Sequence, residues 1–153
     1  RNPSFLKTIS NSELKRIVKE GRKGTQMTAW KSEAAGLTEK QIDEIVKYVA
    51  KDRPSEKSRP FNVAKIKSDI ERGAEIYNNR CALCHGEEGK GGENLLGMTL
   101  RDSALSPEFI AITVRDGRKG TPMVPFGNGG IGLSNQEIAD TVAYVKNLTN
   151  DKK

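Results

Sequence analysis

Two cysteines and one histidine lie within five residues of the chain, in the run Cys81-Ala82-Leu83-Cys84-His85. The sequence contains no other cysteine and no other histidine. Two thiols at this spacing can each add to one of the two vinyl groups of a haem, and an imidazole directly after them can bind the iron as its proximal ligand. The run therefore predicts one haem c, attached covalently through Cys81 and Cys84 and ligated by His85.

Other chemistries of a Cys-x-x-Cys pair fit the sequence less well. A structural zinc site needs four protein ligands, and one chain with only these three residues cannot supply them. A thioredoxin-like pair lies between a strand and a helix of a βαβ unit, whereas the residues around Cys81 have helical periodicity. A plain disulfide between Cys81 and Cys84 would leave His85 without a role.

A loop later in the chain contains the residue that we expect to be the second axial ligand. Residues 117–126 read Gly-Arg-Lys-Gly-Thr-Pro-Met-Val-Pro-Phe, and two prolines with two glycines exclude a regular helix. A thioether is a weak ligand that needs a rigid loop to hold it, and the two prolines stiffen the loop around Met123. The other methionines are Met98, which lies in a connecting segment without such framing, and Met27. We therefore predict Met123 as the ligand.

Three helices must position these groups. Apolar residues three and four positions apart predict a helix over residues 63–77, directly before the haem motif, and another over residues 135–148. A serine–proline pair begins a shorter helix over residues 106–116. Gly73 costs about 1 kcal/mol inside a helix relative to alanine. We therefore expect a close approach at Gly73, with the last helix as the neighbour.

Residues 63–149 resemble class I c-type cytochromes. The motifs that carry the resemblance occur in the family's order and are Gly73-x-x-x-Tyr77, Cys81-Ala82-Leu83-Cys84-His85-Gly86, the Gly-Thr-Pro-Met-Val-Pro-Phe loop and the terminal Ile-Ala-Asp-x-Val-Ala-Tyr-Val helix. The loop is most similar to bacterial c subunits and domains associated with respiratory oxidases and reductases. The resemblance implies an all-α cytochrome c fold around one covalent haem, with the first and last helices crossing beside it.

The resemblance also implies roles for single residues. The thioether anchors would be Cys81 and Cys84, and the proximal and distal iron ligands would be His85 and Met123. The helix crossing would contain Gly73, Tyr77 and Tyr144. The lining of the haem pocket would include Leu95 or Leu96, and Phe126.

The first third of the chain repeats part of this unit. A shift of 96 positions places residues 10–49 on residues 106–145 without a gap, and Gly-Arg-Lys-Gly-Thr-x-Met occurs in both copies. Met27 thereby matches Met123, and Trp30 matches Phe126. The sequence predicts a partial, C-terminal-half cytochrome c-like repeat over residues 1–51, with helices at about 12–20 and 39–50.

This partial repeat lacks a haem-attachment motif, and three explanations stay open. The chain can be a piece of a dihaem cytochrome with two tandem domains, a protein whose first unit lost its haem, or a chain whose Met27 faces a haem held by another segment or chain. Alone, residues 1–51 bury little apolar surface, so we expect them either to be poorly ordered or to pack on the haem domain or a partner. A solvated linker is predicted over residues 52–62, the haem domain over 63–149 and a polar tail over 150–153.

Composition limits the range of functions. The chain has 153 residues and a formal net charge of +6, with basic residues dispersed among acids. There is no Lys/Arg run that would favour nucleic acid, and no apolar stretch approaches the ~20 residues of a membrane span. Such a charge favours docking on redox partners with acidic surfaces. Beside the haem we expect a basic rim formed by Lys90, Arg118 and Lys119.

An iron with two protein ligands suits electron transfer more than substrate chemistry, and Met/His ligation raises its reduction potential. We therefore expect an electron carrier, or the carrier domain of a redox complex, rather than an enzyme. The resemblance implies a periplasmic or otherwise extracytoplasmic location in a bacterium. The alternatives are a haem c enzyme of the peroxidase or thiosulfate-oxidising type and a gas or redox sensor domain.

Overall fold

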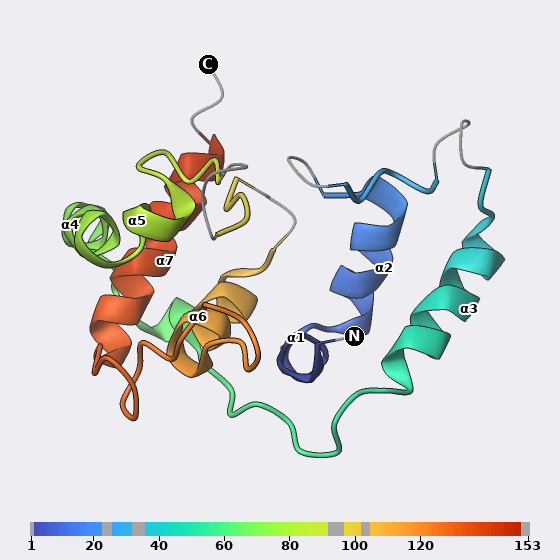
Figure 1. Ribbon diagram of the computed structural model, residues 1–153, viewed down its shortest axis with the longest axis horizontal. Helices are drawn as coiled ribbons and strands as arrows, with labels where there is room; N and C mark the ends of the chain where they lie inside the picture. Colours follow the sequence, from blue (N-terminus) through green and yellow to red (C-terminus); the bar gives the residue numbers. More distant parts are fainter. Residues whose placement is uncertain (1, 23–25, 32–35, 92–96, 102–104, 151–153) are drawn as a thin grey trace.

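The computed structural model describes residues 2–22, 26–31, 36–91, 97–101 and 105–150 (Figure 1). Throughout these ranges the regular structure is helical and contains no β-strand, which confirms the all-α prediction. The elements are α1 (Pro3–Thr8), α2 (Asn11–Glu20), α3 (Glu39–Ala50), the 3-10 turn η1 (Val63–Lys65), α4 (Ile70–Arg80), α5 (Ala82–His85), α6 (Pro107–Asp116) and α7 (Asn135–Asn150). None of these helices is both long and apolar enough to cross a membrane.

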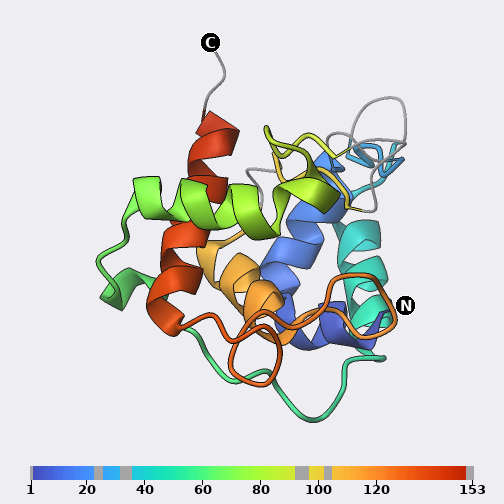
Figure 2. The same cartoon turned by 60° about the vertical axis from the view of Figure 1, so that its left-hand side comes forward.

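Helices α4 and α7 cross in direct contact (Figure 2). The close approach expected at Gly73 is present, because a Cβ atom built there would overlap the carbonyl oxygen of Asp140. One turn further on, the Tyr77 and Tyr144 rings lie 5.2 Å apart between centroids. Tyr77 is fully buried, and its hydroxyl donates to the carbonyl of Gly86 at 2.6 Å. The crossing thus fixes the residues that lead into the haem motif.

The helix expected over residues 63–77 is shorter than predicted. Residues 63–65 form only the turn η1, and Ile66 has extended backbone angles, φ −110° and ψ 121°. Asp69 is also extended, and its side chain accepts from the N–H of Arg72 at 3.0 Å as the N-cap of α4. A side-chain cap of this kind begins a helix, and it overrides the apolar spacing upstream.

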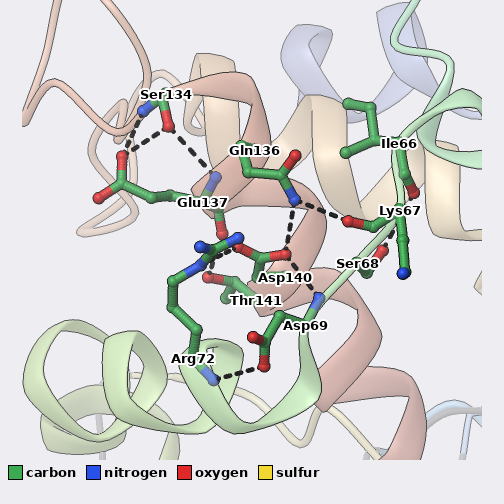
Figure 3. A network of polar contacts seen from close by, with 10 residues as sticks. All are labelled: Ile66, Lys67, Ser68, Asp69, Arg72, Ser134, Gln136, Glu137, Asp140 and Thr141. Carbon is green, nitrogen blue, oxygen red and sulfur yellow. Dashed lines mark hydrogen bonds and ion pairs between the residues drawn. The ribbon is translucent and has the colours of Figure 1, made fainter.

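A polar network holds the start of α4 against α7 (Figure 3). Its centre is Asp140, whose side chain is fully buried. Asp140 accepts from the N–H of Asp69 at 2.8 Å, from Arg72 Nε at 2.6 Å and from Gln136 Nε2 at 2.9 Å. A capping box begins α7, since Ser134 Oγ accepts from the N–H of Glu137 at 3.2 Å and the Glu137 carboxylate accepts from the N–H of Ser134 at 2.8 Å.

Helix α6 lies between two apolar cores. On one side Ala111, Ile112 and Val114 pack with residues of α7 and of the loop before it. On the other side Leu105 and Phe109 pack with buried residues of α2 and α3, namely Leu14, Ile17, Val18, Ile42 and Val46. The first third of the chain therefore packs against the haem domain, and α6 contributes residues to both cores.

Helix α1 was not predicted, and it strengthens this contact. Asn2 caps it by accepting from the N–H of Phe5 at 3.1 Å, and Pro3 occupies its first position. The Phe5 ring meets the Phe109 ring edge to face, with centroids 5.8 Å apart. The carboxylate of Glu13 accepts from the N–H of Ser106 at 3.1 Å, so α2 supplies a hydrogen bond at the start of α6.

The segment predicted as a solvated linker is anchored at both ends. Arg53 donates to the carbonyls of Leu6 and Ile9 at 2.9 and 3.0 Å. At the other end, Phe61 is buried in the core of the haem domain. Both ends of residues 52–62 are therefore held by contacts with protein, in addition to solvent.

Candidate haem site

Helix α4 delivers the haem motif at its end. Cys81 follows α4 as its C-cap and precedes the short helix α5 as its N-cap. The N–H groups of Cys84 and His85 both donate to the carbonyl of Cys81, at 3.1 and 3.0 Å. This single helical turn brings the two thiols and the imidazole together. Both thiols are free and half-buried, and burial raises the pKa of Cys81 to about 11.

The ring of His85 is oriented by the main chain of the following loop. Its Nδ1 lies 2.9 Å from the carbonyl oxygen of Met98. A carbonyl can only accept, so this hydrogen bond places the proton on Nδ1 and leaves the lone pair of Nε2 for a metal. Burial also lowers the pKa of His85, which favours the neutral, ligating form. The ring is thus held as a histidine ligand to iron is held.

The loop can approach the ring because residue 97 is a glycine. A Cβ atom built on Gly97 would lie 2.5 Å from Nδ1 of His85 and 2.7 Å from the carbonyl oxygen of Cys84. The N–H of Gly97 donates to that same carbonyl at 2.9 Å, and the N–H of Gly91 donates to the carbonyl of His85 at 2.8 Å. Sequence reasoning did not find this contact. The glycine directly before Met98 is the only signal that could have indicated it.

The loop expected to carry the distal ligand is ordered by its own hydrogen bonds. The N–H of Arg118 donates to the carbonyl of Met123 at 2.8 Å, and the N–H of Met123 donates to Thr121 Oγ1 at 3.2 Å. Met123 is half-buried against the core of the haem domain, and Phe126 is buried in that core. Arg118 links this loop to the His85 side, because its Nη1 lies 3.9 Å from Met98 Sδ.

The other predicted residues have different surroundings. Met98 is 40% exposed and contributes its carbonyl to His85, while Met27 packs against the core shared by α2, α3 and α6. Leu95 and Leu96, expected to line the pocket, lie outside the described residues. Arg118, expected in a basic surface rim, is instead half-buried, whereas Lys90 and Lys119 are exposed.

The geometry agrees with a comparison to known protein families. The family model described as "Cytochrome C oxidase, cbb3-type, subunit III" matches residues 68–145. The chain belongs to this family of class I c-type cytochromes. The matched cytochrome c domain begins just before α4 and ends within α7, so it contains the haem motif, the loop around Met123 and the helix crossing.

One solved structure agrees on the fold. A chain of the Kuenenia stuttgartiensis reducing HAO-like protein complex Kustc0457/Kustc0458 has a TM-score of 0.56 and 22% identity, over 91% of this chain and 72% of that chain. Cytochrome c6 from the diatom Phaeodactylum tricornutum is 30% identical with a TM-score of 0.44, over 54% of this chain and 97% of that chain. A comparison with curated proteins gave no significant match.

The residues of this cytochrome c domain fit the covalent haem c that the family implies. Two free thiols at thioether spacing stand beside an imidazole whose proton is fixed on Nδ1, so that Nε2 could bind the iron. Leu83, which lies between the two cysteines in the sequence, is 88% exposed. The side of α5 that contains Leu83 is therefore not covered by protein.

Proposed function

We propose that this cytochrome transfers single electrons through one haem c, held by thioethers from Cys81 and Cys84 and ligated by His85 and Met123. The observation that carries the proposal is the hydrogen bond from His85 Nδ1 to the Met98 carbonyl, beside two free thiols. When bound, the haem supplies an iron that gains and loses one electron. The residues of the chain hold it, exclude water from it and keep the imidazole in one tautomer.

His85 and Met123 would both ligate the iron, which would leave no coordination position for a substrate. A thioether ligand would raise the reduction potential, because it favours the ferrous iron. Met123 suits this role because its loop is closed by hydrogen bonds from Arg118 and to Thr121, and two prolines flank it. We therefore assign the chain as an electron carrier, or the carrier domain of a redox complex, and not as an enzyme.

The ligand assignment is tested by spectroscopy of the oxidised protein. We expect the weak near-infrared band of sulfur bound to ferric haem, and we expect Met123→Ala to remove it. Met98→Ala and Met27→Ala are matched controls that should keep the band. Loss of the band in Met98→Ala would overturn the assignment. Binding of carbon monoxide by the reduced wild-type protein would favour a sensor or an enzyme instead.

Haem attachment is tested on the denatured protein. The haem should stay with the polypeptide through acid–acetone extraction, and iron titration should give one haem per chain. A haem that is extracted would exclude thioether bonds to Cys81 and Cys84. Two haems per chain would mean that one of them is held without a Cys-x-x-Cys-His run.

We further propose that residues 1–51 are the distal-ligand half of a second cytochrome c unit. Main-chain hydrogen bonds support this, because those of the first copy recur 96 positions later. The matched pairs, written donor to acceptor, are Gly21→Ile17 and Gly117→Thr113, Arg22→Met27 and Arg118→Met123, Trp30→Val18 and Phe126→Val114, and Leu37→Trp30 and Leu133→Phe126. In this unit Met27 is the equivalent of the distal ligand.

We also propose redox proteins with acidic docking surfaces as partners, and an extracytoplasmic location in a bacterium. The charge of +6 and the exposed Lys90 and Lys119 support electrostatic docking. The structural neighbour belongs to a reducing HAO-like protein complex, which supports redox proteins as partners. The family is typically extracytoplasmic, which supports the location.

A further inference from the structure

The short helix α1 contacts the start of the loop that contains Met123 (Figure 2). Asn2 Nδ2 donates to the carbonyl of Lys119 at 3.2 Å, and the N–H of Lys119 donates to Ser4 Oγ at 3.2 Å. Both main-chain polar groups of Lys119 are therefore bonded to side chains of the first third of the chain, which are 117 and 115 positions away in the sequence.

Lys119 belongs to a hydrogen-bonded turn that ends at Met123. The N–H of Arg118 donates to the carbonyl of Met123 at 2.8 Å, and the carbonyl of Arg118 accepts from the N–H of Thr121 at 3.1 Å and from Thr121 Oγ1 at 2.8 Å. Thr121 Oγ1 also accepts from the N–H of Met123 at 3.2 Å. These bonds make residues 118–123 one unit, so a movement of Met123 would move Lys119 with it.

Helix α1 is itself fixed in place. The carbonyls of Leu6 and Ile9 accept from Arg53, and both of these apolar side chains are buried. Nearer the loop, the Phe5 ring lies 5.5 Å from the guanidinium carbon of Arg118, which adds a cation–π contact to the two hydrogen bonds at Lys119. The loop is therefore tied to a support that is anchored elsewhere in the molecule.

We propose that Asn2 and Ser4 are positioning residues for the distal iron ligand: by holding Lys119, they keep the loop where Met123 ligates the haem iron. The inference rests on the proposed ligation by Met123 and adds the residues that maintain it. A contact favours one of two states only if it is lost in the other. When an external ligand displaces Met123, residues 118–123 move away together and the bonds to α1 are lost. The first third of the chain therefore strengthens the axial ligation of a haem that it does not attach.

The test is a titration of the oxidised protein with imidazole, which competes with Met123 for the iron and removes the near-infrared band. Asn2→Ser keeps a residue that caps α1 but lacks the Nδ2 donor, and Ser4→Ala removes the acceptor for the N–H of Lys119. We expect each variant to bind imidazole about three- to fivefold more tightly than wild type, and the double variant about tenfold more tightly. Each lost hydrogen bond removes a contact that only the Met123-bound state contains.

Thr8→Ala is the matched control in the same helix. Thr8 Oγ1 donates to the carbonyl of Ser4 at 2.9 Å and lies 3.3 Å from Ser58 Oγ, and these contacts do not reach the loop. This variant should leave the affinity for imidazole within about twofold of wild type. An equal gain of affinity in Thr8→Ala would mean that any weakening of α1 has this effect, and it would overturn the specific role of Asn2 and Ser4.

Amide hydrogen exchange of the holoprotein tests the contact itself. In Ser4→Ala the N–H of Lys119 should exchange at least about fivefold faster, whereas the N–H of Gly117, which is bonded to Thr113 within the haem domain, should keep its rate. An unchanged rate at Lys119, or a double variant that binds imidazole within about twofold of wild type, would overturn the proposal. A wild-type protein without the near-infrared band would instead overturn the assignment of Met123, and this inference with it.

Discussion

At the scale of single residues, the main surprise is a carboxylate. Asp140 in α7 is fully buried, and its hydrogen bonds join α7 to the start of α4 (Figure 3). They do not involve the residues of the haem motif. Burial raises the pKa of Asp140, but hydrogen bonds from Arg72, from the N–H of Asp69 and from Gln136 outweigh that effect and hold the pKa below its ordinary value. The carboxylate is therefore charged in the folded protein at neutral pH.

Asp140→Asn should lower the free energy of unfolding by about 2 kcal/mol at pH 7, because an amide nitrogen would face one of the donors. A folded pKa below the unfolded value of about 3.9 means that the carboxylate's contribution is present above that pH and is lost as the pH falls through the folded pKa. The difference in the free energy of unfolding between wild type and Asp140→Asn, measured by urea titration, should thus become smaller below about pH 4.

Glu44→Gln is the control for this measurement. Glu44 lies 96 positions earlier, on the exposed surface of α3, and pairs only loosely with Lys47 at 3.5 Å. Its substitution should change stability by less than about 0.5 kcal/mol. A gap between wild type and Asp140→Asn that stays constant from pH 7 to pH 3 would refute the account.

Single residues also show which parts of the site the sequence could predict. Cys81, Cys84 and His85 could be predicted because thioether chemistry depends on spacing along the chain alone. The Met98 carbonyl could not, because every residue carries a carbonyl and only the fold decides which one meets His85. Arg118 was expected at the surface because it is a charged residue in a glycine-rich loop. The sequence does not indicate that the fold places the rings of Phe5 and Phe109 beside it.

At the scale of elements, prediction succeeded where a cap and an apolar face agree. Helix α6 begins after Ser106 and ends before Gly117 as expected, and α3 spans the predicted residues 39–50. Helix α4 begins seven residues later than expected, because Asp69 caps it and Ile66 packs on the core from an extended segment. Helix α1 has six residues, too few for periodicity to indicate it.

Gly73→Ala should destabilise the protein although alanine is the better helix former. Helix propensity alone predicts a gain of about 1 kcal/mol. The added methyl group would instead overlap the carbonyl of Asp140, and this carbonyl cannot move away because it belongs to the main chain of α7. We therefore expect the free energy of unfolding, measured with denaturant, to fall by about 1–3 kcal/mol or more.

Asn78→Ala, at an exposed position of the same helix, should leave stability equal or slightly higher. This control separates the effect of helix propensity from that of the helix crossing. If Gly73→Ala were as stable as wild type, α4 and α7 would not be in main-chain contact.

At the scale of the whole molecule, charge should control the approach of redox partners. The net charge is +6, and Lys119 is exposed on the loop that contains Met123. Electron exchange with anionic ferricyanide should slow as salt rises past about 0.1 M, where screening acts over about 10 Å. Lys119→Glu should slow this reaction at low salt and reduce its dependence on salt.

A cationic reagent such as hexaammineruthenium is the matched probe, and its rate should rise with salt and rise in Lys119→Glu. Stopped-flow absorbance of the haem measures both reactions. Rates that do not depend on salt for either reagent would remove electrostatic steering from the account.

The contacts that dock the first third of the chain onto α6 have a consequence for folding. They join residues that are far apart in sequence: 93 positions for Glu13 and Ser106, and 115 for Ser4 and Lys119. Closing loops of this length costs chain entropy before any contact compensates, so docking of α1 and α2 should come late. At 5–20 residues per second, a ribosome needs roughly 5 to 20 s to pass from Glu13 to Ser106. During that time α6 has not been synthesised and cannot cover the apolar sides of α2 and α3. The first third of the chain therefore exposes these sides until α6 leaves the ribosome.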